Sequence, residues 1–363
     1  MKYGIYGGAF DPMHLEHYEL IKRAKEELSL DKIVVVPSGN APHKSTMTSY
    51  ADRVNMIKLT VDEDVLIDDV ENTLSGLTNT ARILPVLKEK YGDIVFIMGG
   101  DSFFDIEKWI KPEVVLSFPI AVVPRAGSRD ALVEKAERYN SQGKNIKVLR
   151  YVGKDVSSTF ARTKLYLRLP CDVVSPKCYE YAIQNRIYGK YYDMLDKLAA
   201  ALTPKRFRHS LNVAVEAVKL NEQLKLDYDK VMTAAILHDA SKYSTRPHPE
   251  LPENLTKGPI AHAFIGAEEI QTDYGIRDED IINAVRYHTT GRANMSDLEK
   301  LIYLADLLEE DRAFDGVEKL REIAHKDFNA GFVQAVEAQL KYLGEGEDVC
   351  PLTLECFEFY KNK

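Results

Sequence analysis

The chain has 363 residues, of which 45% are hydrophobic and 29% charged, as in an ordinary globular protein. At roughly 150 residues per domain, this length predicts two or three separately packed cores. The net charge of −8 excludes a global basic field that would recruit nucleic acid. Any substrate phosphates must therefore be bound by local groups.

The sequence also predicts a cytoplasmic protein without membrane contact. Its four cysteines, Cys171, Cys178, Cys350 and Cys356, form no CxxC pair and are too few for a disulfide scaffold. The first predicted strand begins at Lys2, which leaves no room for a signal peptide. No apolar run approaches the ~20 residues that a membrane span needs. We therefore expect reduced thiols.

The first half alternates short apolar runs with amphipathic stretches. The apolar runs predict strands over residues 3–6, 33–36, 65–67, 94–98, 120–123 and 146–152, with helices between them that include 18–28 and 80–91. Buried strands separated by helices are typical of a Rossmann-like α/β fold, a doubly wound parallel sheet. Ligands of such sheets bind beyond the carboxyl ends of the strands.

The pattern changes after Tyr188-Gly189. From residue 190 onward there is no strand-like alternation, and apolar residues such as Leu211, Val215 and Val218 recur at helical spacing. We therefore predict a domain boundary at Gly189, with an α/β domain over residues 1–189 and an all-α domain over residues 190–363.

The first candidate site is a strand-to-helix turn, residues 7–17, with the sequence GGAFDPMHLEH. The paired glycines Gly7 and Gly8 let the backbone approach a ligand closely, and a helix N-terminus offers unpaired N–H groups to anions. His14 and His17 lie on one face of the first helical turn. Two imidazoles there can donate hydrogen bonds to a triphosphate and stabilise charge on a leaving pyrophosphate.

The string GGxFDPxHxxH resembles the signature of the nucleotidylyltransferase superfamily with the HIGH-type motif. Four further segments, in order as far as Tyr188, narrow the resemblance to bacterial nicotinate mononucleotide adenylyltransferases: PSGNAPHK at 37–44, GDS at 100–102 with Trp109 downstream, PRAG at 124–127 and SSTFAR at 157–162. The resemblance implies that nicotinate mononucleotide reacts with ATP, accompanied by Mg²⁺, to give deamido-NAD and pyrophosphate. Because the nucleophile is the substrate's own phosphate, catalysis should rest on positioning and charge stabilisation.

The resemblance also implies roles for individual residues. Ser158 and Thr159 start a helix, so we expect them to cap it and present N–H groups to phosphate. Asp101 is implied to meet the ATP ribose, and Trp109 to stack on the pyridine ring, although filling the core is its alternative role. The implied catalytic residues are His14, His17 and Arg162, and the implied ATP- or substrate-binding residues are Gly7, Gly8, Phe10, Lys44, Thr78, Asp101, Trp109, Arg125, Ser158 and Thr159.

Glu16 departs from the family pattern, since many relatives carry Gly at this position. We expect its side chain to turn outward, because a carboxylate that points at a triphosphate is unfavourable. The alternative assignments of this half, a cytidylyltransferase or a pantetheine-phosphate adenylyltransferase, are disfavoured by Trp109 and by the Pro42-His43-Lys44 loop.

The second candidate site is a set of histidines and aspartates in the helical half. The pair His238-Asp239 ends an apolar helical run over residues 231–237, and the other members lie within or beside predicted helices. Imidazole and carboxylate ligands together suit Fe, Mn or Zn better than Ca or Mg, and such metals lower the pKa of bound water. We expect Fe or Mn in a dinuclear site. The candidate ligands are His209, His238, Asp239, His262, His288 and Asp306.

The order H…HD…H…H…D resembles that of HD-domain hydrolases. The LTPKR segment at 202–206, the HTTG segment at 288–291 and Ala305-Asp306 narrow the resemblance, over about residues 190–345, to symmetrical diadenosine tetraphosphate hydrolases. This implies cleavage to two ADP with iron in the HD site. Lys242, one turn beyond the HD pair, is placed to meet a substrate phosphate, and Arg292 and Arg312 are candidates for further positive charge.

Two alternatives remain open for the helical half. It could hydrolyse another phosphorylated nucleotide, or it could be a regulatory module that senses a nucleotide without hydrolysing it. The presence of all six candidate ligands argues against the sensor, and an assay of bound metal and hydrolysis distinguishes the two.

Overall fold

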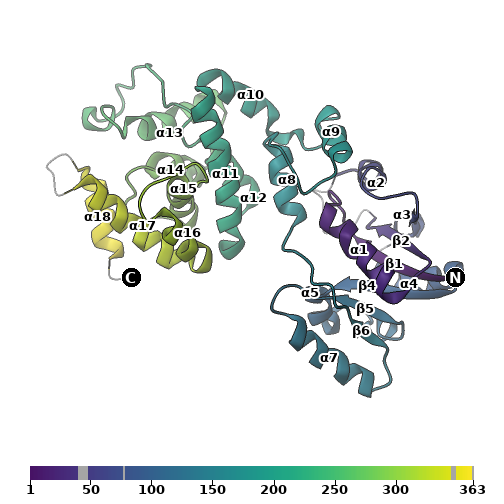
Figure 1. Ribbon diagram of the computed structural model, residues 1–363. Helices are drawn as coiled ribbons and strands as arrows, with labels where there is room; N and C mark the ends of the chain where they lie inside the picture. Colours follow the sequence, from purple (N-terminus) through teal and green to yellow (C-terminus); the bar gives the residue numbers. More distant parts are fainter. Residues whose placement is uncertain (40–47, 77, 345–348, 362–363) are drawn as a thin grey trace. The chain divides into compact units, whose positions relative to one another are not determined.

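The computed structural model describes residues 1–39, 48–76, 78–344 and 349–361, so Lys44 lies outside the described residues. The chain divides into two compact units, Met1–Gly189 and Lys190–Lys363 (Figure 1), and each is described by itself. In the part of the chain that is described, no helix is both long and apolar enough to cross a bilayer.

The N-terminal unit is built on a parallel sheet with the strand order β3-β2-β1-β4-β5-β6. The strands are β1 Lys2–Gly8, β2 Lys32–Pro37, β3 Val65–Ile67, β4 Asp93–Gly99, β5 Ile120–Val123 and β6 Ile146–Val148. All six predicted strands are confirmed, and so is the doubly wound fold. The last strand is shorter than the predicted 146–152, because β5, the strand with which it pairs, ends at Val123.

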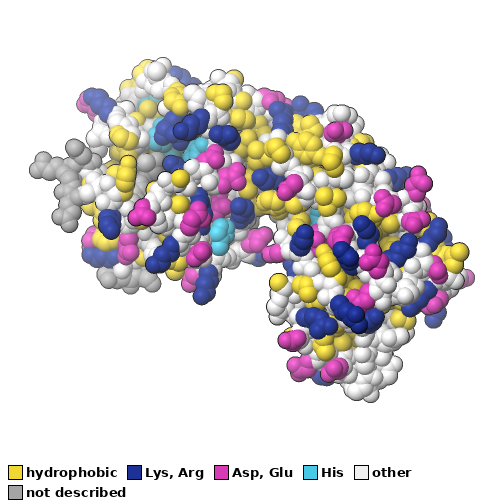
Figure 2. All heavy atoms as spheres, in the orientation of Figure 1, with side chains coloured by type: hydrophobic (Ala, Val, Ile, Leu, Met, Phe, Trp, Pro, Cys, Tyr) yellow, Lys and Arg dark blue, Asp and Glu magenta, His cyan; other side chains and the backbone are white. Residues whose placement is uncertain are grey.

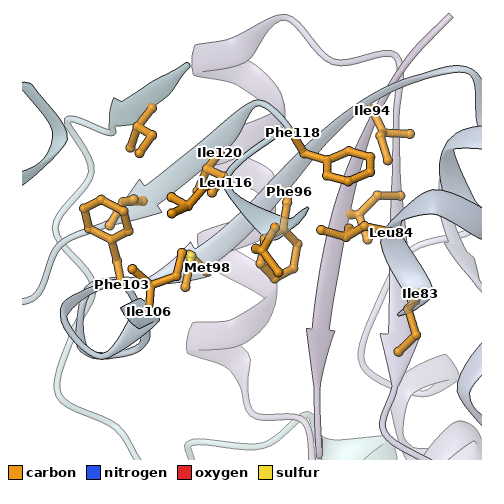
Figure 3. Close-up of a cluster of buried hydrophobic side chains, with 14 of the residues drawn as sticks. Ile83, Leu84, Ile94, Phe96, Met98, Phe103, Ile106, Leu116, Phe118 and Ile120 are labelled. Atoms are coloured by element: carbon orange, nitrogen blue, oxygen red, sulfur yellow. The ribbon is translucent and has the colours of Figure 1, made fainter. Parts of the chain in front are cut away.

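Both faces of the sheet are buried beneath helices. Along β4, Ile94, Phe96 and Met98 point to one face, and Val95 and Ile97 to the other. On the first face these side chains pack against apolar residues of the surrounding helices (Figure 3). The helical segments of this unit are α1 Leu15–Leu28, α2 Tyr50–Lys58, α3 Val70–Thr73, α4 Thr80–Tyr91, α5 Gly100–Phe104, η1 Ile106–Lys108, α6 Pro112–Val115, α7 Arg129–Ser141, α8 Ser158–Tyr166 and α9 Pro176–Gln184.

The strand order reverses between β1 and β4. From β1 the chain proceeds outward to β2 and β3, whereas from β4 it proceeds the other way to β5 and β6. The segments that follow β1 and β4 therefore diverge and leave a crevice at the carboxyl ends of these strands. Gly7 and Gly8 end β1, and Asp101 lies in α5, which begins at Gly100 where β4 ends, so two motifs far apart in sequence reach the same crevice.

In the C-terminal unit the described residues form helices joined by turns and loops, with no strand among them, as predicted. Its central helix, α11, begins with Thr203 as the N-cap and Pro204 in its first turn, and ends at Lys225, which has a left-handed backbone. The side chain of Thr203 accepts a hydrogen bond from the Arg206 N–H, which satisfies one free donor of the helix end. The helical segments are η2 Gly189–Tyr191, α10 Tyr192–Ala201, α11 Pro204–Leu224, α12 Tyr228–Leu237, η3 Glu253–Leu255, α13 Ala261–Asp273, α14 Glu279–Tyr287, α15 Asp297–Leu308, α16 Val317–Lys326, α17 Phe328–Leu343 and α18 Pro351–Tyr360.

Candidate active sites

A cavity of about 240 Å³ lies at the crevice between β1 and β4. Its lining combines the turn after β1, the start of α5, and the segments that follow β5 and β6. Six of the residues predicted from the sequence line it: Gly7, His14, His17, Asp101, Trp109 and Arg125. Tertiary structure thus brings residues from three of the motif segments of the N-terminal half, 7–17, 100–109 and 124–127, to one cavity.

His14 and His17 form a reciprocal cap on α1. The Nδ1 atom of His14 accepts a hydrogen bond from the His17 N–H at 3.2 Å, and Nδ1 of His17 accepts from the His14 N–H at 3.3 Å. The two rings stack with their centroids 3.5 Å apart. Because both Nδ1 atoms are acceptors, each neutral ring carries its proton on Nε2 and keeps that N–H as a donor.

Both imidazoles are held in the neutral form near pH 7. Burial and the neighbouring Arg125 lower the pKa of His14 to about 4. Burial, His14 and Arg125 together hold the pKa of His17 well below its usual range. The pair therefore offers hydrogen-bond donors rather than fixed positive charge.

The start of α8 differs in detail from the sequence expectation. Ser157, not Ser158 or Thr159, caps the helix, because its hydroxyl accepts from the Phe160 N–H at 3.1 Å. The Ser158 hydroxyl instead donates to the Pro12 carbonyl at 3.1 Å. The expected cap was thus wrong by one residue, although the helix begins where predicted.

Arg162 joins α8 to the turn that follows β1. Its Nη1 donates to the Asp11 carbonyl at 2.7 Å, and its Nη2 donates to the Thr159 hydroxyl at 3.0 Å. Neither Arg162 nor Thr159 is among the residues that line the cavity. In this structure the guanidinium therefore holds the turn in place.

Phe10, Gly8 and Thr78 also lie outside the cavity lining. Phe10 is buried and contacts the His17 ring edge-on at 5.4 Å. A Cβ atom on Gly8 would lie 2.9 Å from the Phe10 ring, so a larger residue there would displace it. The Thr78 hydroxyl lies 3.4 Å from Glu71 Oε2.

Asp101, Arg125 and Trp109 line the same cavity. Arg125 forms ion pairs with Asp101 at 3.2 Å and with Asp155 at 3.7 Å. The Trp109 ring packs edge-on against Phe96 at 6.5 Å between centroids and also lines the cavity. The structure thus places Trp109 both against the core and in reach of a ligand.

Arg53 is a residue that the sequence reasoning missed. It is buried, and it donates to three main-chain carbonyls: Ala9 at 2.7 Å, Ser38 at 2.7 Å and Thr48 at 3.1 Å. It thereby joins the turn after β1 to the segment after β2. The available signal was its position on α2, where it shares a helical face with the buried Met56 and Ile57.

Glu16 does not turn outward. Its carboxylate lines the cavity, and its Oε1 accepts hydrogen bonds from the Tyr151 hydroxyl at 2.7 Å and from the Lys154 N–H at 3.0 Å. The side chain therefore points toward residues 151–154, which follow β6.

In the C-terminal unit, the six predicted ligands converge. His209 lies on α11, His238 and Asp239 follow α12, His262 lies in the first turn of α13, His288 follows α14, and Asp306 lies on α15. Ligand atoms come together in three overlapping groups, which are His209, His238 and Asp239; His238, His288 and Asp306; and Asp239, His262 and His288. No pair of these residues except His238-Asp239 is adjacent in sequence, so the tertiary fold builds the cluster.

Asp239 lies between the groups. Its Oδ2 lies 3.6 Å from His238 Nε2, and its Oδ1 lies 3.1 Å from His262 Nε2. On the first side, His209 Nε2 lies 3.0 Å from Asp306 Oδ1. On the other side, the Nε2 atoms of His262 and His288 are 3.2 Å apart.

This donor set fits a divalent metal. Asp239 Oδ1 is buried without a hydrogen-bond partner, and a cation satisfies such an oxygen. The Nδ1 atoms of His238 and His288 lie 2.7 Å from the carbonyls of Ala235 and Val285. These bonds leave Nε2 of both rings free of protons and able to coordinate. The buried cluster therefore has the donors that could hold a divalent metal ion.

The ionisation of the cluster also suits a cation. Burial and the neighbouring imidazoles of His238 and His262 together lower the pKa of His288 to about 3. Burial acts to raise the pKa of Asp239, but the electrostatic influence of His238, His262 and His288 outweighs it and holds that pKa well below the usual range. These shifts favour neutral imidazole at His238 and His288 and an ionised carboxylate at Asp239, the forms that bind metals.

Cationic side chains surround the cluster. Lys242 Nζ lies 3.0 Å from His262 Nε2, and Arg206 Nη1 donates to Asp239 Oδ2 at 2.7 Å. Arg312 pairs with Asp306. Arg292, by contrast, binds Glu299 through two hydrogen bonds of 2.8 and 2.6 Å, so the structure does not place it at the cluster. Figure 2 shows histidine beside Lys and Arg side chains on the exposed face of this unit.

Sequence reasoning did not single out Arg206 or Glu309. Glu309 is buried, and its Oε1 lies 3.1 Å from His209 Nδ1. Their spacing in the sequence could have pointed to both residues, since Arg206 precedes His209 by three residues and Glu309 follows Asp306 by three. That spacing places each beside a ligand on the same helical face.

The parallel sheet with its histidine-bearing turn is typical of a nucleotidylyltransferase. The helical unit with its His/Asp cluster is typical of an HD-type metal-dependent protein. Family models agree: the Cytidylyltransferase-like family matches residues 5–164, and the HD domain family matches residues 206–311.

Known relatives correspond to one or both parts. The symmetrical bis(5'-nucleosyl)-tetraphosphatase of Bacillus subtilis is 37% identical over 39% of this chain and 81% of its own length. A probable nicotinate-nucleotide adenylyltransferase of Aquifex aeolicus is 35% identical over 43% of this chain and 98% of its own length. A probable nicotinate-nucleotide adenylyltransferase/Ap4A hydrolase of Mycoplasma genitalium is 28% identical over 85% of this chain and 87% of its own length.

The chain therefore belongs to two families, the nicotinate-nucleotide adenylyltransferases and the symmetrical bis(5'-nucleosyl)-tetraphosphatases.

Proposed function

We propose that this chain is a bifunctional enzyme. Residues 1–189 transfer AMP from ATP to nicotinate mononucleotide, and residues 190–363 hydrolyse diadenosine tetraphosphate to two ADP. The cavity at the switch point, with its two neutral histidines, carries the first assignment. The convergence of six ligands on one buried cluster carries the second. We expect both activities in the cytoplasm.

In the first reaction, a phosphate oxygen of nicotinate mononucleotide attacks the α-phosphorus of ATP, and the bond to pyrophosphate breaks. The Nε2–H groups of His14 and His17 donate to oxygens on which negative charge grows, which stabilises the transition state. Asp101 binds the ribose, Trp109 stacks on the pyridine ring, and Gly7 allows close approach of the phosphates. Mg²⁺ accompanies the ATP phosphates.

Arg162, Ser158 and Thr159 support this site from α8. In the structure Arg162 and Ser158 bond to carbonyls of the turn at Asp11 and Pro12. We propose that the first-turn N–H groups of α8 bind ATP phosphate and that Arg162 adds positive charge. We also propose that Lys44, Phe10 and Thr78 contribute to binding of ATP or the mononucleotide, as the resemblance to nicotinate mononucleotide adenylyltransferases implies.

In the second reaction, the ligands are His209, His238, Asp239, His262, His288 and Asp306. We propose that they hold two ions of Fe or Mn, because Asp239 presents one oxygen to each side of the cluster. A metal of this kind polarises water and phosphoryl oxygens. Lys242, Arg206 and Arg312 bind the phosphate oxygens of the substrate.

A product assay on the purified full chain tests both activities. We expect deamido-NAD from nicotinate mononucleotide with Mg²⁺ and ATP, and ADP as the sole nucleotide from diadenosine tetraphosphate with Fe or Mn. The amide analogue, nicotinamide mononucleotide, should react with much lower kcat/KM, because donors arranged for a carboxylate are left poorly paired by an amide.

Two variants serve as controls for each other. His17→Ala should lower adenylyl transfer by about 10²-fold or more and leave hydrolysis unchanged. Asp239→Ala should abolish bound metal and hydrolysis together and leave adenylyl transfer unchanged. Equal use of both mononucleotides would contradict the first assignment, and bound metal without hydrolysis of diadenosine tetraphosphate would favour another nucleotide substrate or a sensor.

A further inference from the structure

Lys154 is a cation at the adenylyl-transfer cavity that has no anionic partner among the described residues. It lines the cavity and its side chain is exposed. The other fixed cation there, Arg125, is already engaged by Asp101 and Asp155, and both histidines are neutral. A ligand with several phosphates would therefore find in Lys154 the one uncommitted positive charge of the described lining.

Lys154 lies on a segment with little regular structure. After β6 ends at Val148, the chain is held to the sheet at Gly153, whose N–H donates to the Pro124 carbonyl at 2.8 Å. The next residues, as far as the N-cap of α8 at Ser157, form neither helix nor strand. The position of the Lys154 side chain therefore depends on contacts made by this segment.

Glu16, on α1, supplies such a contact. Its Oε1 accepts both the Lys154 N–H and the Tyr151 hydroxyl, at 3.0 and 2.7 Å. Burial and this hydrogen bond raise the pKa of Tyr151 far above its usual range, so the hydroxyl remains a donor. Because Glu16 lies in the first turn of α1, between His14 and His17, it links the segment to the histidine pair.

The same hydrogen bonds explain how the Glu16 carboxylate can lie beside a cavity that is proposed to bind an anionic substrate. Two donors bind the same oxygen, which disperses its charge toward the segment rather than the cavity.

We propose that Lys154 binds the phosphates of the nucleoside triphosphate and that Glu16 is a positioning residue, which fixes the 151–154 segment so that the ammonium faces the cavity. The proposal rests on the adenylyl-transfer activity proposed above, and it assigns to both side chains roles in binding that substrate.

The test measures ATP affinity of the full chain with Mg²⁺, without the acceptor nucleotide, together with KM and kcat. Five variants are compared: Glu16→Gln, Glu16→Ala, Lys154→Met, Lys154→Arg and the double variant Glu16→Ala/Lys154→Met. Glu19→Ala is the matched control, because Glu19 lies one turn later on α1 and pairs with the exposed Arg23 instead. Hydrogen exchange of residues 151–156 reports directly on the order of the segment.

We expect Lys154→Met and Glu16→Ala each to weaken ATP binding by about tenfold, with Lys154→Arg restoring most of the loss. Glu16→Gln keeps an acceptor oxygen and should stay within about twofold of wild type. In the Lys154→Met background, Glu16→Ala should add less than about twofold, because it acts through the missing ammonium. Exchange in the segment should rise in Glu16→Ala but not in Glu16→Gln or Glu19→Ala.

Tighter ATP binding by both Glu16→Ala and Glu16→Gln would overturn the proposal, since Glu16 would then only repel the phosphates. Additive losses in the double variant, or unchanged binding in Lys154→Met, would also overturn it. A wild-type chain that forms no deamido-NAD would refute the assigned reaction instead, and ATP affinity that still follows Glu16 and Lys154 would support this proposal.

Discussion

Glu309 Oε1 lies 3.1 Å from Nδ1 of His209, and Nε2 of the same ring faces the metal cluster. The carboxylate thereby fixes the ring orientation and keeps the coordinating nitrogen free of a proton. We expect Glu309→Leu to weaken metal binding by about 10- to 100-fold, as measured by titration of the apoprotein. Glu309→Gln keeps an acceptor oxygen and should retain most of the affinity; equal losses in both variants would show that the charge, not the hydrogen bond, is what matters.

Arg53 satisfies three carbonyls in a buried position, so its loss leaves acceptors unpaired. We predict that Arg53→Met destabilises the N-terminal unit by about 3 kcal/mol or more. Trp109, the single tryptophan of the chain, makes fluorescence a probe of that unit during denaturant unfolding. The exposed Arg23→Met is the control and should unfold like wild type; similar midpoints for the two variants would refute the assigned role of Arg53.

The histidine pair should make adenylyl transfer insensitive to pH around 6.5. The pKa of His14 is lowered to about 4, so the neutral donor form persists through that range. We expect kcat to stay level from pH 8 to 6 and to fall only as pH approaches 4. An inflection near 6.5 that disappears in His14→Asn would mean that the ring titrates normally.

The low pKa of His14 also makes the stability of the folded N-terminal unit depend on pH. Between about pH 4 and 6.5 the unfolded chain binds a proton at His14 that the folded chain does not bind, so stability is lost as pH falls through this window. His14→Asn keeps a side-chain cap for α1 but removes the titrating group. Unfolding followed by Trp109 fluorescence should therefore depend less on pH in the variant than in wild type, and an identical dependence would contradict the shift.

Cleavage of diadenosine tetraphosphate should be symmetric. Arg206 and Arg312 pair with different carboxylates of the cluster, Asp239 and Asp306, so cations lie at two places along a bound polyphosphate. An inner phosphorus at the metals leaves an ADP-sized piece on either side. In ¹⁸O water, mass spectrometry should find the label in one of the two ADP molecules formed per turnover. ATP plus AMP as products would mean that an outer phosphorus is attacked.

The two units should fold independently, because each contains its own core. We expect fragments 1–189 and 190–363, expressed separately, to be soluble and to retain adenylyl transfer and hydrolysis respectively. Circular dichroism and the two product assays measure this. Insoluble fragments from a chain that folds when intact would contradict the two-domain organisation.

Much of this protein follows from local sequence. Apolar runs separated by amphipathic stretches identified all six strands, because a parallel strand buried on both faces must be apolar throughout. The HD pair and the spaced histidines predicted the cluster of His and Asp side chains, because imidazole and carboxylate together form a recognisable metal-binding donor set. The turn at residues 7–17 identified the first site by its glycines and histidines.

Tertiary structure decided which partners each of those residues has. The sequence could not show that Glu16 reaches Tyr151 and Lys154, because they are 135 and 138 residues away along the chain. It could not show that Arg53 is buried against three carbonyls, or that Arg292 is bound to Glu299 and not to the cluster. Local patterns specify which groups are available, whereas hydrogen bonds between distant segments depend on how the sheet and helices pack.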